Sequence, residues 1–151
     1  MERNEEKFFC ILNIIIPILV GAVVYYILSP EVIFVRQIDA LIGRDFRFTE
    51  IVEKGWFLRL VRNYLLDVLW GYALLVALYF MFGSNTAELL KTLIIAFVFS
   101  AVMELLQLTS IAKGTFDVFD IIVEFFAEMV AVFIIKKYTT LRRKGKNEKK
   151  I

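Results

Sequence analysis

The sequence predicts an all-α integral membrane protein, a single domain over residues 1–151 with four transmembrane helices and a long amphipathic loop between the first two. Hydrophobic residues make up 60% of the chain, whereas a soluble domain contains about 45–50%. The apolar residues fall into four separate runs, each long enough to approach a bilayer width. The chain has no histidine and one cysteine, which excludes an internal disulfide, a Cys-rich zinc site and histidine-based catalysis.

The predicted spans cover residues 8–28, 64–82, 92–108 and 118–135. The first is a run of 21 residues without a charged side chain, enough for a hydrocarbon core of about 30 Å at about 1.5 Å per residue. It lacks the short core and small-residue cleavage site of a signal peptide, so we expect an uncleaved anchor. A kink at Pro17 is tolerated in membrane helices, and Cys10 is expected to be an inert thiol.

Two short turns set the order of the last three spans. Gly83, Ser84 and Asn85 are typical of a turn and follow the second span. Lys113 and Gly114 lie in a very short connection between the third and fourth spans. These two spans are therefore predicted to form an antiparallel hairpin.

The connection over residues 29–63 mixes apolar and charged residues and is not a plain linker. Apolar side chains at Phe34, Ile38, Leu41 and Ile42 have helical spacing. This pattern predicts one or two short amphipathic helices on the membrane surface or against the end of the bundle. Trp56 suits the interfacial region.

The basic residues predict the orientation. The tail over residues 136–151 holds eight of the eighteen lysines and arginines, and such flanks remain cytoplasmic. An even number of spans then places both termini in the cytoplasm of a multi-pass cell-membrane protein. The tail is either only this topology signal or also a site of attraction to anionic lipid, worth about 1 kcal/mol per basic residue near the surface.

Acidic residues inside the spans are the most informative feature, because a central charge costs at least about 2.5–3.5 kcal/mol. In the fourth span the acids are separated by three, four and four residues, which confines them to a stripe of roughly 80°. They are Asp117, Asp120, Glu124 and Glu128. The third span carries Ser100, Glu104 and Gln107 on one face, and the second carries Asn63, Asp67 and Gly71.

The predicted topology brings these groups to a similar depth. Asp67 lies about 6 Å into the second span, and Glu104 about 6–8 Å from the outer end of the third. Asp120 and Glu124 lie about 4–10 Å into the fourth. We therefore expect an acidic pocket near the outer face, with Glu128 nearer the middle.

The acids of such a pocket must be protonated, paired with cations or hydrated. The rim cation candidates are Arg59, Arg62 and Lys113. A bound metal cation is another partner, because hard cations favour carboxylate oxygens; whether one binds is left open. The structural alternative is polar contact between helices, worth about 0.6 kcal/mol each.

The same residues carry a resemblance to the VanZ-like membrane proteins. Glu104-Leu-Leu-Gln107, a short turn and Asp117-Val-Phe-Asp120-Ile-Ile-Val-Glu124 resemble the hallmark of that family. Upstream, Arg62-Asn63 followed by Asp67 and Trp70-Gly71 is similar to the start of the family's second helix. The family's arginine falls on Gly114, beside Lys113, its asparagine on Glu124, its glycine on Ala127 and its proline on Leu69.

The resemblance implies a four-helix cell-membrane protein associated with low-level resistance to glycopeptide antibiotics, especially lipid-bearing teicoplanin. The family has no agreed enzyme reaction and no cofactor. We expect an outer-leaflet acidic pocket that contacts a membrane lipid, an envelope lipid or a drug. The oligomeric state is left open.

Two other classes are weighed against this interpretation. A small cation- or proton-coupled transporter would use protonatable acids in a bundle, but internal repeats, common in transporters, are not visible. A membrane enzyme is the weakest, because no nucleophile–base pair or Gly-rich phosphate loop is evident. Nucleic-acid binding is not expected, because the basic tail is short and lacks interleaved aromatic residues.

Overall fold

The computed structural model describes residues 2–28, 37, 40–41, 43, 56–109 and 116–148, and within these ranges four long helices form the fold. The helices are α1 (Glu2–Leu28), α4 (Trp56–Met81), α5 (Leu89–Gln107) and α6 (Val118–Glu148), with a 3-10 turn, η1 (Thr86–Glu88), before α5. Most of the predicted loop 29–63 lies outside the described residues, as do Lys113 and Gly114.

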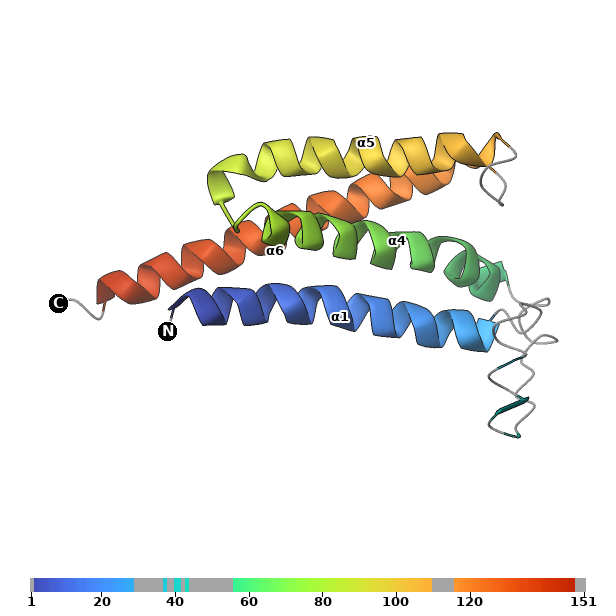
Figure 1. The fold of residues 1–151 in the computed structure, drawn as a ribbon, viewed down its shortest axis with the longest axis horizontal. Helices are drawn as coiled ribbons and strands as arrows, with labels where there is room; N and C mark the ends of the chain where they lie inside the picture. Colours follow the sequence, from blue (N-terminus) through green and yellow to red (C-terminus); the bar gives the residue numbers. More distant parts are fainter. Residues whose placement is uncertain are drawn as a thin grey trace.

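The four helices run alternately up and down (Figure 1), so that both chain termini lie at the same end. Helix α4 is central and packs against α1, α5 and α6, while α5 also packs against α6. The α4–α5 turn lies at the end with the termini, and the C-terminal end of α5 and the N-terminal end of α6 lie at the opposite end. The predicted antiparallel arrangement of the third and fourth helical segments is therefore confirmed.

Three of the described helices are long and apolar enough to cross a membrane, over Asn4–Ile27, Tyr64–Met81 and Thr86–Gln107. The predicted helical class is confirmed, and the length and composition of these three segments suit a membrane span. Helix α6 has the required length but carries Asp120, Glu124 and Glu128 in its first half.

The surface of the bundle is unusually apolar for a protein in water. Large side chains are exposed along α1, α5 and α6, among them Ile16, Leu19, Leu90, Val98 and Phe133. Soluble monomers rarely expose contiguous apolar patches larger than a few hundred Å². A surface of this kind suits contact with lipid.

Two helix boundaries differ from those the sequence predicts. Helix α4 begins at Trp56, eight residues before the predicted span, and α6 continues through Glu148 into the basic tail. The apolar runs mark only the part of each helix that suits hydrocarbon. Lysine, arginine, leucine and glutamate all favour a helix, so α6 continues where its apolar run ends.

The predicted turn after the second span is confirmed. Gly83 has φ 80° and Ser84 has φ 58°, and the left-handed region is open to glycine at no steric cost. Asn85 caps η1, because its side-chain oxygen accepts a hydrogen bond from the backbone N–H of Ala87 at 3.1 Å. The hydroxyl of Tyr79 donates to the Ser84 carbonyl at 2.8 Å and anchors the turn.

The basic tail is partly tied to the N-terminal helix. A guanidinium nitrogen of Arg142 lies 3.3 Å from a carboxylate oxygen of Glu6, and another lies 3.9 Å from Glu5. One helical turn earlier, Tyr138 stacks on Phe9 with ring centroids 3.9 Å apart. These contacts join α1 and α6 at the end where the termini lie.

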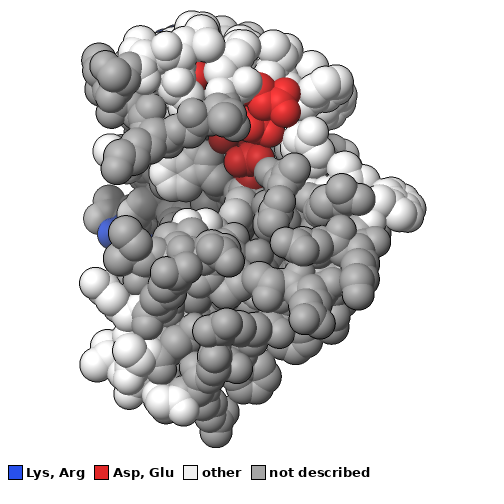
Figure 2. Space-filling model, turned by 90° about the vertical axis from the view of Figure 1, so that its right-hand side faces the viewer, with Lys and Arg blue, Asp and Glu red and all other residues white. Residues whose placement is uncertain are grey.

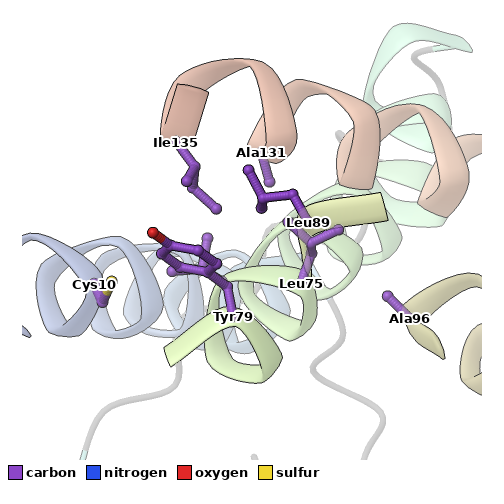
Figure 3. Packing of buried hydrophobic residues seen from close by; sticks show 8 residues of the cluster. Cys10, Leu75, Tyr79, Leu89, Ala96, Ala131 and Ile135 are labelled. Atoms are coloured by element: carbon purple, nitrogen blue, oxygen red, sulfur yellow. The ribbon is translucent and has the colours of Figure 1, made fainter. Parts of the chain in front are cut away.

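The apolar core occupies the half of the bundle nearer the termini. Figure 3 shows Leu75 and Tyr79 of α4 gathered with Leu89, Ala131 and Ile135. All five are at most 2% exposed. Cys10 of α1 is also fully buried in this cluster, as expected for an inert thiol.

One glycine allows α4 and α6 to approach closely. A Cβ atom on Gly71 would lie 2.9 Å from the backbone oxygen of Glu124 and 3.1 Å from its Cα. Because both atoms belong to the backbone, the two helices would have to move apart to admit it. Gly71 therefore sets the separation of α4 and α6 at the level of Glu124.

Gly71→Ala is expected to destabilise the bundle by about 1–3 kcal/mol, the usual range for overpacking. The free energy of unfolding in detergent micelles, measured by circular dichroism, checks this. Gly21→Ala is the matched control, because its added Cβ would meet side-chain atoms at an ordinary 3.7 Å. Equal stability of the two variants would contradict a close contact at Gly71.

Candidate functional site

The acids of α6 become progressively more buried along the helix. Asp117 and Asp120, at its start, are partly exposed. Glu124 is 6% exposed and Glu128 is fully buried. The spacing of these residues places them on one face, and that face turns into the bundle. The acidic stripe therefore runs from the end of α6 toward the middle of the protein.

Helix α5 runs antiparallel to α6 and also has a polar face. Glu104 is 6% exposed and accepts a hydrogen bond from the Gln107 amide at 2.6 Å. One turn deeper, the hydroxyl of Ser100 donates to Oε1 of Glu128 at 3.2 Å. Ser100 also interacts with the Glu124 carboxyl. Helices α5 and α6 are thus joined by polar contacts at two successive depths.

Helix α4 adds Asp67 to this group. Its carboxyl interacts electrostatically with Asp120, Glu124 and Glu104. Asp67 lies close to the start of the apolar stretch Tyr64–Met81 but eleven residues from the start of α4. The close helix contact at Gly71, one turn further along α4, brings the backbone of Glu124 toward this face.

The structure therefore brings together five of the seven predicted pocket residues from three helices, namely Asp67, Glu104, Gln107, Asp120 and Glu124. We call these five residues, with Ser100 and Glu128, the acidic cluster. Figure 2 views the end of the molecule opposite the termini and shows acidic side chains gathered in one patch between other side chains. Part of the cluster thus reaches the surface at this end.

Asp117 has a local structural role in addition to its place near the cluster. Its carboxylate accepts a hydrogen bond from the backbone N–H of Phe119 at 2.9 Å. This contact satisfies one of the free donors at the start of α6, as an N-cap residue does. Its carboxyl also interacts electrostatically with Asp120.

The remaining predicted site residues fall outside what the structure describes. Asn63, Arg59 and Arg62 lie within α4, but their side chains are not among the described ones, and Lys113 is outside the described ranges. The predicted pairing of the acids with cations at the rim therefore stays a prediction. The two ion pairs between described side chains, Arg142 with Glu5 and Glu6, lie at the other end of the bundle.

Ser100 and Glu128 are the members that sequence reasoning left out of the candidate pocket. Glu128 looked too deep to join an outer-face site, and Ser100 alone suggested ordinary polar contact between helices. The available signal was the four-residue spacing of Glu124 and Glu128, matched by Ser100 and Glu104 on the antiparallel helix. That pattern places the two members of each pair on one face of their own helix.

Three carboxyl groups of the cluster are incompletely satisfied. Among the described residues, Oε2 of Glu104, of Glu124 and of Glu128 is buried without a hydrogen-bond partner. Buried polar groups are normally hydrogen-bonded, and an unpaired one is expensive at low dielectric. Within the same part of the chain, no group of three or more acidic or cysteine side chains is arranged to hold a metal ion.

An apolar groove lies beside the acidic cluster. It has a volume of about 540 Å³ and is bounded by α1, α4 and α6, with Pro17, Leu69, Tyr72 and Phe126 among its lining residues. A neighbouring hollow of about 320 Å³ lies between α1 and α4 and shares Pro17 and Leu69. Helices α1 and α6 diverge from the end with the termini (Figure 1), and α4 lies between them.

Comparison with protein families, with curated proteins and with solved structures finds no match to this chain.

Proposed function

We propose that this chain is a VanZ-like cell-membrane protein that alters susceptibility to glycopeptide antibiotics of the teicoplanin type. In this proposal it crosses the membrane four times, keeps both termini in the cytoplasm and acts through an acidic pocket in the outer leaflet. The observation that carries the proposal is the meeting of acids from α4, α5 and α6 at the end of the bundle opposite the termini.

The outer surface of α6 supports a fourth span. Ile122, Phe126, Val130 and Phe133 are all exposed, and their spacing places them on one face of the helix. That face lies opposite the acidic stripe at 100° per residue. A helix with an apolar outer face and an acidic inner face can cross a membrane as one wall of a bundle.

The position of the basic residues supports the proposed orientation. The C-terminal end of α6 is rich in lysine and arginine and lies beside the N-terminus. Flanking basic residues are retained in the cytoplasm, so in this proposal the acidic cluster lies at the opposite, outer face. The pocket would then lie where an antibiotic or envelope lipid arrives.

The apolar groove supports contact with a lipid-bearing molecule. Its volume of about 540 Å³ lies within the usual range of about 300–1,000 Å³ for small-molecule sites. Val68 of α4 and Val123 of α6 line the groove, and each is the direct neighbour of a cluster acid, Asp67 and Glu124. An acyl chain in the groove and a polar group near the acids would suit one amphiphile.

Glu104→Gln and Asp120→Asn test this proposal, because each removes one charge with little change in shape. Either variant is expected to abolish the difference in teicoplanin susceptibility between cells with and without the protein. The measurement is the inhibitory concentration in an isogenic strain, with the membrane level of each variant determined by immunoblot.

Glu88→Gln is the matched control, because Glu88 lies on the α4–α5 turn, away from the acidic cluster. This variant should retain the full effect. Unchanged susceptibility after deletion of the whole gene would contradict the proposed function.

A small cation- or proton-coupled transporter is the second candidate. The buried carboxyl groups with free oxygens favour it, since intramembrane acids are typical of such proteins. Purified protein in sealed vesicles would then carry a pH- or cation-dependent flux that Glu124→Gln removes, as measured with a fluorescent pH indicator inside the vesicles. Absence of any flux above that of protein-free vesicles would exclude this candidate.

A further inference from the structure

The three free carboxylate oxygens of the acidic cluster require a positively charged or hydrogen-bonding partner. Glu104, Glu124 and Glu128 are each more than nine-tenths buried, and Oε2 of each lacks a partner among the described residues. Three ionised carboxylates in these positions would repel one another at low dielectric. The arrangement therefore points to a ligand that neutralises the carboxyl groups.

Among the described side chains, the groups facing these carboxyls do not supply such a partner. Their neighbour on α4 is Asp67, and their neighbour on α6 is Asp120. On α5 their neighbours are the Ser100 hydroxyl and the Gln107 amide. The Ser100 hydroxyl already donates a hydrogen bond to Oε1 of Glu128, and the Gln107 amide donates one to Oε1 of Glu104. No described group of acids is arranged for a metal ion. A proton, which needs no coordination shell, fits these conditions.

The acids form a continuous path from the end of the bundle to Glu128. Asp117, Asp120, Glu124 and Glu128 follow one another at intervals of one helical turn and become steadily more buried. Eleven residues of α helix cover about 16 Å at the standard rise. Successive carboxyl groups at this spacing can relay a proton between them, as acidic chains do in membrane proteins.

The path is blind. One turn beyond Glu128 lie Ala131 and then Ile135, both fully buried and packed with Leu75 and Tyr79 of α4 (Figure 3). On α5, the residue one turn beyond Ser100 is Ala96, which is also fully buried. These alanine and isoleucine side chains offer no group to accept a proton. The hydroxyls of Tyr79 and Thr92 elsewhere in the core already donate hydrogen bonds, that of Tyr79 to Glu6 and Ser84 and that of Thr92 to the Glu88 carbonyl.

We infer that Glu104, Glu124 and Glu128, the last two bridged by Ser100, form a proton-binding site at the inner end of an acid-lined path that opens at the end of the bundle opposite the termini. A hydronium ion at the open end gives its proton to Asp117 or Asp120 and becomes water. The proton then passes to a deeper carboxylate, which becomes a neutral carboxyl group. The site loads and releases protons from one side, and it does so independently of the proposed role in antibiotic susceptibility.

Infrared spectroscopy of the whole protein in lipid nanodiscs tests the site, because a protonated carboxyl group absorbs separately from a carboxylate. A carbonyl band of protonated carboxyl groups is expected at neutral pH, where exposed acids are ionised. The band should shift when H₂O is replaced by D₂O. Glu128→Gln should lose the intensity of at least one carboxyl group, whereas Glu88→Gln should lose none.

Three other results of this experiment would overturn the inference. Absence of the band at neutral pH would show that the carboxyls are ionised. Removal of the band by sodium or potassium at constant pH would assign the site to an alkali cation. If Glu128→Gln fails to fold, Glu124→Gln takes its place, and full retention of the band in that variant would place the protonated groups elsewhere. Unchanged susceptibility after deletion of the gene, with the band present in the purified protein, would refute only the proposed function.

Discussion

In the proposed arrangement, with α6 as a fourth span, the cost of placing carboxyl groups in hydrocarbon is the constraint on which the structure depends. A charged side chain at the centre of a membrane costs at least about 2.5–3.5 kcal/mol, so the acids of α6 must turn toward other helices. Glu104 and Ser100 of α5 and Asp67 of α4 meet them there. Lipid tails give no hydrophobic drive for association between helices, so packing and such polar contacts have to hold the bundle together.

Different interactions hold the helices together in the two halves of the bundle. Near the termini, Leu75, Tyr79 and Ile135 form a close-packed apolar core, and Arg142 joins α6 to Glu6 of α1. At the other end the helices meet through carboxyl, amide and hydroxyl groups, with Gly71 allowing α4 and α6 to approach. The rigid apolar half would hold the helices in place while the polar half remains open to exchange at its surface.

Much of this arrangement could be predicted from the sequence, because hydrocarbon imposes simple rules. Run length predicts the helices, and helical spacing predicts that Asp120 and Glu124 share a face. The continuation of α6 to Glu148 could not be predicted in this way, because hydropathy marks only the lipid-facing part of a helix. The pairing of Ser100 with Glu128 depends on the relative register of two helices, which the sequence of neither specifies.

Chemical cross-linking in membranes tests most directly whether α4 and α6 turn their acids toward each other. In a Cys10→Ala background, Asp67→Cys combined with Asp120→Cys is predicted to give an efficient intramolecular cross-link with a short thiol reagent. Asp67→Cys combined with Phe119→Cys is the matched pair, because Phe119 is 62% exposed on the neighbouring position of α6. This second pair is predicted not to cross-link. Equal yields from the two pairs, or a link through residue 119 alone, would contradict the acidic cluster.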